Sequence, residues 1–225
     1  MSKRLWGEVA MGHNDAVPPP PAHEVLPFPP GDGPFRVKGV AYRGHCEYVE
    51  RFLAGGLAAQ QAGVVDARLR GFLGQTFLAA SWYDVYPLVA AGSVCARIAG
   101  RTLPDFLRVR ARYQAEQDLR GVYRAALTVA SPALLAERLP PMFQRYFDFG
   151  EAQVSEAGPR ARDVQVAGVP ATLAPWLGPI LQTFSLTALE YNGTRRPEAK
   201  LLPFRVTGVT HGLDVGVMRL AISWP

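Results

Sequence analysis

The residues with the greatest potential for chemistry are an aromatic group in the middle of the chain, in the stretch SWYDVYP. It places Trp82, Tyr83 and Tyr86 within five residues of one another. Such rings can offer stacking faces and hydroxyls to a small apolar or aromatic ligand, but they can equally form the centre of a hydrophobic core. We expect these aromatic side chains to form part of the hydrophobic core in the first place, and to line a ligand-binding site only as the second interpretation. The candidate ligand-binding residues are six aromatic side chains: Phe77, Trp82, Tyr83, Tyr86, Tyr146 and Trp176.

Histidine and cysteine are too few and too scattered to predict a metal site. The chain has four histidines and two cysteines, and His45-Cys46 is the one adjacent pair. Neighbouring residues on a helix point in different directions, so these two side chains cannot easily hold one ion. We interpret the pair as a buried thiol beside a half-buried histidine. Cys95 is expected to be a small core residue.

No signature of catalysis is present in the sequence. There is no Gly-x-Ser-x-Gly elbow and no glycine-rich phosphate loop. Proximity of Cys46 to His45 in the sequence does not create the spatial pair that nucleophilic catalysis requires. We therefore predict no catalytic residues and no enzyme activity, and an enzyme of unknown class remains the weakest alternative.

Composition indicates one ordinary domain. The chain has 225 residues, of which 48% are hydrophobic, and a formal net charge of +5. A basic surface can attract nucleic acid, but almost all basic residues are arginine, as a GC-rich coding bias would produce, so we expect no nucleic-acid partner. No apolar run is long enough to span a bilayer, and no secretory signal is recognisable. With so few cysteines, these features predict a cytoplasmic protein.

The N-terminal segment differs from the rest in its proline content. Residues 1–34 hold eight of the twenty prolines. Proline at this density favours extended polyproline II conformations, so we predict an extended arm over 1–34 and a single domain over 35–225. The alternative is an arm laid on a partner or on the domain's own surface through four apolar side chains: Trp6, Val25, Leu26 and Phe28.

The first part of the domain is predicted to be helical after one short strand. A strand is expected over 35–40, and the helical periodicity around 45–53 stops at Gly55-Gly56. Further helices are expected over 64–80, over 102–129, and from Ser131-Pro132 to residue 149 with an interruption at Pro140-Pro141.

A capping motif is predicted in the aromatic stretch itself. Ser81 would be the N-cap of a helix that ends at Gly100, with Asp84 three residues after the cap. Pro87 would then lie inside that helix, where proline removes a hydrogen bond. A helix start nearer to Tyr86 is therefore the alternative.

The hydrophobic period changes to that of strands after Gly150. Strands are expected over 152–157, 163–169, 202–209 and 213–224, with a helix over 170–191 between the two pairs. His211-Gly212 predicts a hairpin between the last two strands. The predicted fold class is α+β: a helical N-terminal part followed by a β-β-α-β-β unit that forms one antiparallel sheet packed on helices.

Three stretches carry a resemblance to known proteins: FRVKGVAYRGHCEYVERF, SWYDVYP and LDVGVMRLAISWP. Over 35–225 the chain resembles an uncharacterised myxobacterial paralogous family of similar length. More distantly, its layout is similar to 4-vinyl-reductase-type small-molecule-binding domains, haem–nitric-oxide sensor domains and trafficking-complex subunits of that fold. The resemblance implies a pocket between helices and sheet, and a dimer. Haem sensors of this type use a Tyr-x-Ser-x-Arg signature with a helix histidine; that triplet is missing here, so no cofactor is expected.

These observations predict a non-catalytic cytoplasmic sensor or adaptor domain that acts in signalling or regulation. It would bind an apolar or aromatic small molecule, or a partner protein, and work as a homodimer. The alternative is a pure protein–protein interaction module with a filled core, in which the arm and an exposed helix face do the binding. A hollow interface between helices and sheet would favour the sensor.

Overall fold

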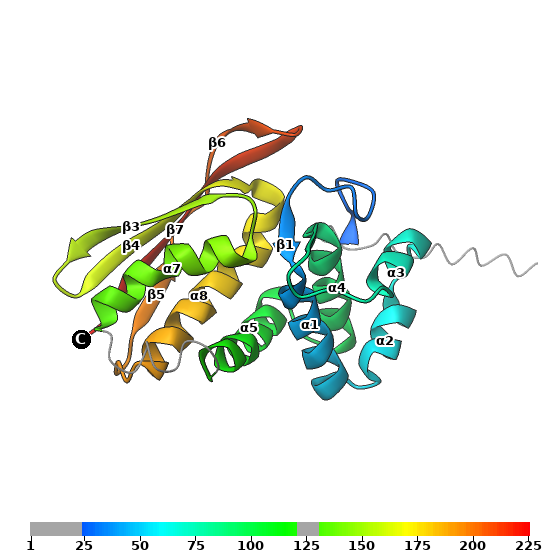
Figure 1. Cartoon of the computed structure of the whole chain (residues 1–225), viewed down its shortest axis with the longest axis horizontal. Helices are drawn as coiled ribbons and strands as arrows, with labels where there is room; N and C mark the ends of the chain where they lie inside the picture. The colour runs from blue at the N-terminus through cyan, green and yellow to red at the C-terminus, as the bar shows by residue number, and fades with distance from the viewer. Residues whose placement is uncertain (1–23, 121–130) are drawn as a thin grey trace, which may run out of the picture.

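The computed structural model describes residues 24–120 and 131–225, and its first part is helical (Figure 1). Its elements are β1 (Arg36–Lys38), α1 (Gly39–Phe52), α2 (Gly56–Gly63), α3 (Ala67–Leu73), β2 (Trp82–Asp84), α4 (Tyr86–Ile98) and α5 (Leu103–Arg120). The end of the helix predicted over 102–129 lies outside the described residues.

The second part combines two long helices with one sheet. Its elements are α7 (Pro132–Tyr146), β3 (Glu151–Gly158), β4 (Ala161–Pro170), the 3₁₀ turn η2 (Ala171–Leu173), α8 (Ala174–Tyr191), β5 (Glu198–Leu201), β6 (Arg205–Thr210) and β7 (Leu213–Ser223). The α+β prediction is confirmed. The strand predicted over 202–209 corresponds to β6, which begins only at Arg205, and β5 before it was not predicted. None of the helices in the described ranges combines the length and apolar character that a membrane crossing requires.

The sheet is antiparallel and is organised around its longest strand, β7. The strand order is β3-β4-β7-β5, and β6 pairs with the other end of β7. His211 and Gly212 both have positive φ, 51° and 76°, as a tight hairpin turn requires, so the predicted hairpin is confirmed. Met218 and Leu220 of β7 alternate with more exposed neighbours and are buried, which follows from the two-residue period of a strand.

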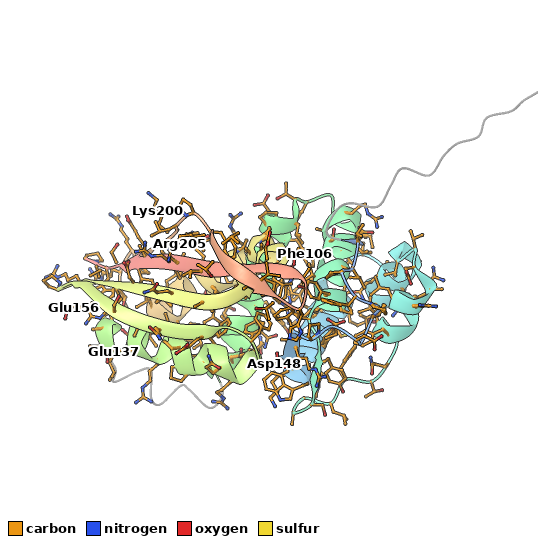
Figure 2. The ribbon with its side chains drawn as sticks, turned by 90° about the horizontal axis from the view of Figure 1, so that it is seen from above. Phe106, Glu137, Asp148, Glu156, Lys200 and Arg205 are labelled. Atoms are coloured by element: carbon orange, nitrogen blue, oxygen red, sulfur yellow. The ribbon has the colours of Figure 1, made fainter. Side chains whose placement is uncertain are left out.

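One face of the sheet is covered by α7 and α8, and α5 packs against α8 (Figure 1). The opposite face carries polar pairs such as Arg219 and Asp163, 3.0 Å apart. Figure 2 looks onto the sheet, with Lys200 near the β5 edge and Glu156 near the β3 edge. Apolar side chains therefore gather between the sheet and its helices, where the core of this part lies.

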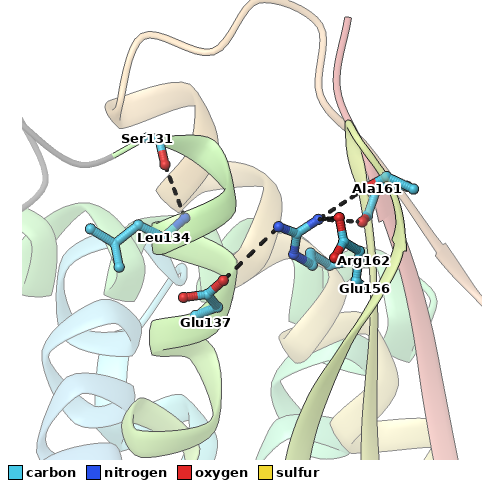
Figure 3. Close-up of polar contacts among 7 residues, drawn as sticks. Ser131, Leu134, Glu137, Glu156, Ala161 and Arg162 are labelled. Carbon is cyan, nitrogen blue, oxygen red and sulfur yellow. Dashed lines mark hydrogen bonds and ion pairs between the residues drawn. The ribbon is translucent and has the colours of Figure 1, made fainter.

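A partly buried arginine, Arg162, joins α7 to the β3–β4 hairpin (Figure 3). The guanidinium of Arg162 donates to the carbonyl oxygens of Ala161 (2.8 Å) and Gly158 (3.1 Å). Its nearest carboxylates are Glu156 at 3.9 Å and Glu137 of α7 at 4.0 Å. These contacts connect the N-terminal half of α7 to the sheet.

The helix that follows Ser131 has the predicted start but not the predicted interruption. Ser131 Oγ accepts the N–H of Leu134 at 3.2 Å, as an N-cap does (Figure 3). The helix then continues through Pro140 and Pro141, so the expected break there was wrong. α8 likewise contains Pro179. Because proline has no N–H, each of these residues leaves the carbonyl four positions earlier without its helical donor.

The predicted helix start at Ser81 was wrong. Trp82–Asp84 forms β2, which pairs with β1 so that Tyr83 lies opposite Val37. α4 begins at Tyr86, which confirms the alternative, and puts Pro87 in the first turn, where its missing N–H costs no bond. The predicted end is confirmed, since Gly100 follows the helix with a φ of +62°.

The helix predicted over 64–80 is shorter than its apolar pattern suggests. α3 ends at Leu73, and the following segment carries Phe77 into the core without helical structure. Gly74 follows the helix directly, and its N–H bonds to the carbonyl of Arg70 at 3.0 Å. The apolar spacing that indicated a longer helix includes Phe77, which is buried from an irregular loop, and Leu78, which is exposed.

The described end of the proline-rich segment lies on the domain. Asp84 Oδ2 accepts the N–H groups of Gly31 and Gly33, each at 3.1 Å. Leu26 and Phe28 pack on the core, whereas Val25 is exposed. Trp6 lies outside the described residues. These contacts fit the alternative in which the arm lies on its own domain, and the boundary at residue 35 stays a prediction.

Candidate functional site

A cavity of about 90 Å³ lies between the helices and the sheet. α5, α7 and α8 form its helical walls, and β4 and β7 form its floor. Its apolar lining includes Leu139, Met142 and Phe143 from α7, Ile180, Leu181 and Phe184 from α8, and Val164, Val166, Met218 and Leu220 from the sheet. The helix–sheet interface is therefore hollow.

Three polar side chains of the cavity come from one face of α5. Arg110, Gln114 and Asp118 line it at intervals of four residues, which places them in one row along the helix. Gln114 Nε2 donates to Asp118 Oδ1 at 3.0 Å, and the hydroxyl of Tyr146 donates to Asp118 Oδ2 at 2.5 Å. Burial raises the pKa of Asp118, while these two donors oppose that rise.

Arg110 stands out because its charge is buried with little compensation. The residue is only 5% exposed, and Nη2 donates to the carbonyl of Ala41 in α1 at 2.9 Å. Among the described residues, Nε–H has no acceptor, and no carboxylate lies within 4.0 Å of the guanidinium. Burial lowers the pKa of Arg110, yet a guanidinium remains protonated in proteins.

Gln114 also has a buried oxygen, Oε1, without a hydrogen-bond partner. That oxygen touches α1 at Gly44, since a Cβ built on Gly44 would overlap it. Glycine at this position lets the backbone of α1 approach α5 closely, with its Cα–H facing the amide oxygen. The unpaired atom of Gln114 is therefore covered by backbone, in contrast to the unpaired Nε–H of Arg110.

A second set of buried polar side chains lies between α1, α2 and α4, and its members form hydrogen bonds with one another. His45 Nε2 is 2.7 Å from Gln60 Oε1, and Cys95 Sγ donates to the same oxygen at 3.2 Å. An amide oxygen only accepts, so Nε2 of His45 carries the proton. Burial lowers the pKa of His45 to about 3, so the ring is neutral at neutral pH.

This arrangement corrects the expected environment of the His45-Cys46 pair. His45 is the buried member at 2% exposure, and Cys46 is only partly buried, because α1 turns His45 toward α2 and α4. Cys95 is a buried core residue, as predicted. In residues 24–120 and 131–225, no group of three or more His, Cys, Asp or Glu side chains is placed to hold a metal ion.

Four of the six aromatic candidates lie away from the cavity. Phe77 stacks on Tyr42 with ring centroids 4.1 Å apart, and Tyr83 meets Phe77 edge-on at 5.0 Å. Tyr86 bonds through its hydroxyl to Thr172 at 3.1 Å. Trp82 is 37% exposed, with Lys38 Nζ 3.9 Å above its ring. We call Tyr42, Phe72, Phe77 and Tyr83 the packed cluster.

Tyr146 and Trp176 are the two candidates that line the cavity. Together with Phe143, Phe147 and Phe184 they form what we call the cavity cluster. That these side chains bind a ligand stays a prediction. The polar row on α5 was missed, although its spacing of four residues was a readable signal that Arg110, Gln114 and Asp118 share one helix face.

Comparison with known proteins shows similarity in fold only. No family profile and no curated protein matches the sequence. An Fe(II) unliganded H-NOX (haem–nitric-oxide-binding) protein from K. algicida matches with 12% identity and a TM-score of 0.54, over 84% of this chain and 96% of that chain. A Cs H-NOX mutant matches with 6% identity and a TM-score of 0.58, over 83% and 96%. A T. tengcongensis H-NOX mutant matches with 5% identity and a TM-score of 0.55, over 82% and 93%.

One of the matched structures concerns haem whose porphyrin is distorted by the protein. The residues around the cavity of this chain do not fit haem. About 90 Å³ is far below the roughly 300–1,000 Å³ of cofactor-sized sites. Its described lining has no histidine or cysteine to serve as an axial ligand. His45 faces Gln60, and the ring of His211 packs on Phe35 in the hairpin turn. The chain thus shares the fold of H-NOX domains, while the described lining of its own cavity does not fit haem.

Proposed function

We propose that this chain is a non-catalytic sensor domain that binds a small, largely apolar molecule between α5, α7, α8 and the sheet. The observation that carries the proposal is the hollow, almost wholly apolar centre of the helix–sheet interface. Protein interiors are normally close-packed, so a void lined by so many apolar side chains lacks the contacts that would otherwise stabilise the core. A ligand of matching shape would restore them.

The cavity volume limits the size of the ligand. An apolar cavity of about 150 Å³ binds benzene, so about 90 Å³ limits the ligand to a molecule no larger than a single small ring or a short branched chain. The competing function, an interaction module with a filled core, is not favoured by this interface. H-NOX structures of similar fold support the use of this architecture for small-molecule sensing.

The test is the binding of small neutral apolar probes to the full chain. Benzene and toluene should raise the melting temperature by mass action and should shift the indole N–H resonance of Trp176, which lines the cavity. Ala111 also lines the cavity and is 2% exposed, so Ala111→Leu should fill the space and abolish both effects. Ala58→Leu adds the same atoms to an exposed position of α2 and is the control.

Failure of every small probe, neutral or charged, to bind the wild-type chain would refute the proposed function. The same proposal includes a homodimer that acts in cytoplasmic signalling. Light scattering on the purified chain should give twice the monomer mass of 24.5 kDa. A monomer would remove the dimer from the proposal without affecting the binding site.

A further inference from the structure

The buried guanidinium of Arg110 has only part of the partners that its burial requires. One donor, Nη2, is satisfied by the Ala41 carbonyl, while Nε–H is buried without an acceptor. Burying a charge is expensive unless hydrogen bonds and an opposite charge compensate it. Among residues 24–120 and 131–225, no carboxylate forms an ion pair with this guanidinium.

The position of Arg110 ties this missing partner to the cavity. Arg110 lines the cavity together with Val166, Met218 and Phe184, which supply apolar surface. The acidic residue of the lining, Asp118, lies eight residues further along α5, about 12 Å by the helical rise, so it forms no ion pair with Arg110, although its charge acts to raise the pKa of Arg110. Asp118 already accepts from Gln114 and Tyr146. The cavity therefore has a cationic group with an unused donor at Arg110, an apolar body, and an acidic group at Asp118 whose two oxygens are already hydrogen-bonded.

We propose, building on the proposed function, that the ligand is a small monocarboxylic acid whose carboxylate meets Arg110 and whose short apolar or aromatic body fills the cavity. The carboxylate would accept the Nε–H bond and balance the buried charge. A guanidinium and a carboxylate are matched in shape and form strong charge-assisted hydrogen bonds. The small volume favours one planar headgroup with a body of one ring or a few carbons.

The experiment compares each acid with its neutral amide on the full chain. Isovalerate and benzoate are titrated against isovaleramide and benzamide by calorimetry at neutral pH, with benzene and toluene as the apolar reference. Each acid should bind at least about tenfold more tightly than its amide, the preference expected for one charge-assisted bond. Arg110→Met should remove this preference. Arg108→Gln deletes the same charge from the exposed side of α5 and should preserve it.

The outcomes separate this inference from the function on which it rests. Equal affinity for acids and amides, or binding of the neutral references alone, would overturn the carboxylate inference and leave small-molecule binding in place. Failure of every probe would overturn both. Because the preference is measured on the wild-type chain, a poorly folded Arg110→Met does not block the test. Arg110→Lys, which keeps the charge but lacks Nε–H, should then show a reduced preference.

Discussion

The packed cluster and the cavity cluster are both rich in aromatic rings, yet only one of them encloses space. In the packed cluster, Phe77 contacts the rings of Tyr42, Phe72 and Tyr83, and the Tyr42 hydroxyl donates to the Asp84 carbonyl at 2.6 Å. In the cavity cluster, Trp176 and its neighbours surround a void of about 90 Å³. A high density of aromatic residues in a sequence therefore indicates a packed core. A ligand-binding site has to be recognised by the cavity that the packed side chains leave between them.

Polar groups show the same contrast. The buried His45, Gln60 and Cys95 satisfy one another in the first region. Beside the cavity, Arg110 keeps a donor without an acceptor. Since most buried polar groups in folded proteins are paired, the exception identifies the region where a ligand can add a bond.

The contrast should appear most strongly when an aromatic ring is removed from each region. Phe77→Ala should lower the free energy of unfolding by about 3–5 kcal/mol, as expected for a well-packed ring. Phe184→Ala should cost clearly less, because Phe184 is only partly buried and already borders the void. Urea denaturation measures both values. Equal losses would mean that the two clusters are packed alike.

Acid should destabilise the first region through His45. Its pKa is about 3 when folded and 6.5 when unfolded, so its contribution is complete above pH 6.5 and is lost as the pH falls toward 3. The loss amounts to ~1.4 kcal/mol per pH unit within that window. Burial raises the pKa values of Asp84 and Asp118, which therefore act in the opposite direction.

The measurement is the free energy of unfolding between pH 7 and pH 4 for the wild type and for His45→Gln. The variant keeps a donor toward Gln60 but has nothing to protonate, so its stability should fall less with acid. Parallel curves for the two proteins would contradict the assignment of a neutral, buried His45.

Replacing a buried alanine by the larger leucine should distinguish the closely packed first region from the cavity. Ala90 in α4 is completely buried in the first region, and Ala90→Leu should cost about 1–3 kcal/mol by overpacking. Ala111→Leu should leave the free energy of unfolding nearly unchanged or raise it, because the new side chain enters the cavity. A comparable loss in the second variant would show that the void cannot accept a side chain.

The smallest effects concern the two serines that precede β2 and α7. Ser131→Ala should cost about 1 kcal/mol, since Ser131 Oγ caps the N-terminus of α7. Ser81→Ala should stay within about 0.5 kcal/mol, because the residue precedes a strand and its side chain caps no helix. Chemical denaturation of both variants checks the order, and a larger loss at Ser81 would reverse it.

Sequence reasoning succeeded where local chemistry decides the structure. The alternation along β7, the turn at His211-Gly212, the cap at Ser131 and the helix end at Gly100 are all encoded by neighbouring residues. The start at Ser81 failed because β2 exists only through its pairing with β1, which lies far away in the sequence. No local pattern within three residues can reveal such a partner.

The site was predictable only in part for a similar reason. Tyr146 and Trp176 were identified as candidates because aromatic residues commonly line apolar pockets. Arg110 was not, because Arg108, Arg110 and Arg112 look alike in the sequence. Arg108 and Arg112 pair with Asp105 and Glu190 at the surface, whereas Arg110 faces inward. That difference depends on where α1 and α8 pack against α5.

The prolines inside α7 and α8 have a consequence for how quickly the cavity exchanges its contents. These two helices are cavity walls, and Pro140, Pro141 and Pro179 remove three amide donors from them. α5 has its proline, Pro104, in the first turn, where no donor is lost. Local unfolding of α7 or α8 therefore breaks fewer backbone hydrogen bonds at these positions, so amide hydrogen exchange should be faster in α7 and α8 than in α5. The residence time of a bound molecule would then be set by the fluctuations of these two helices.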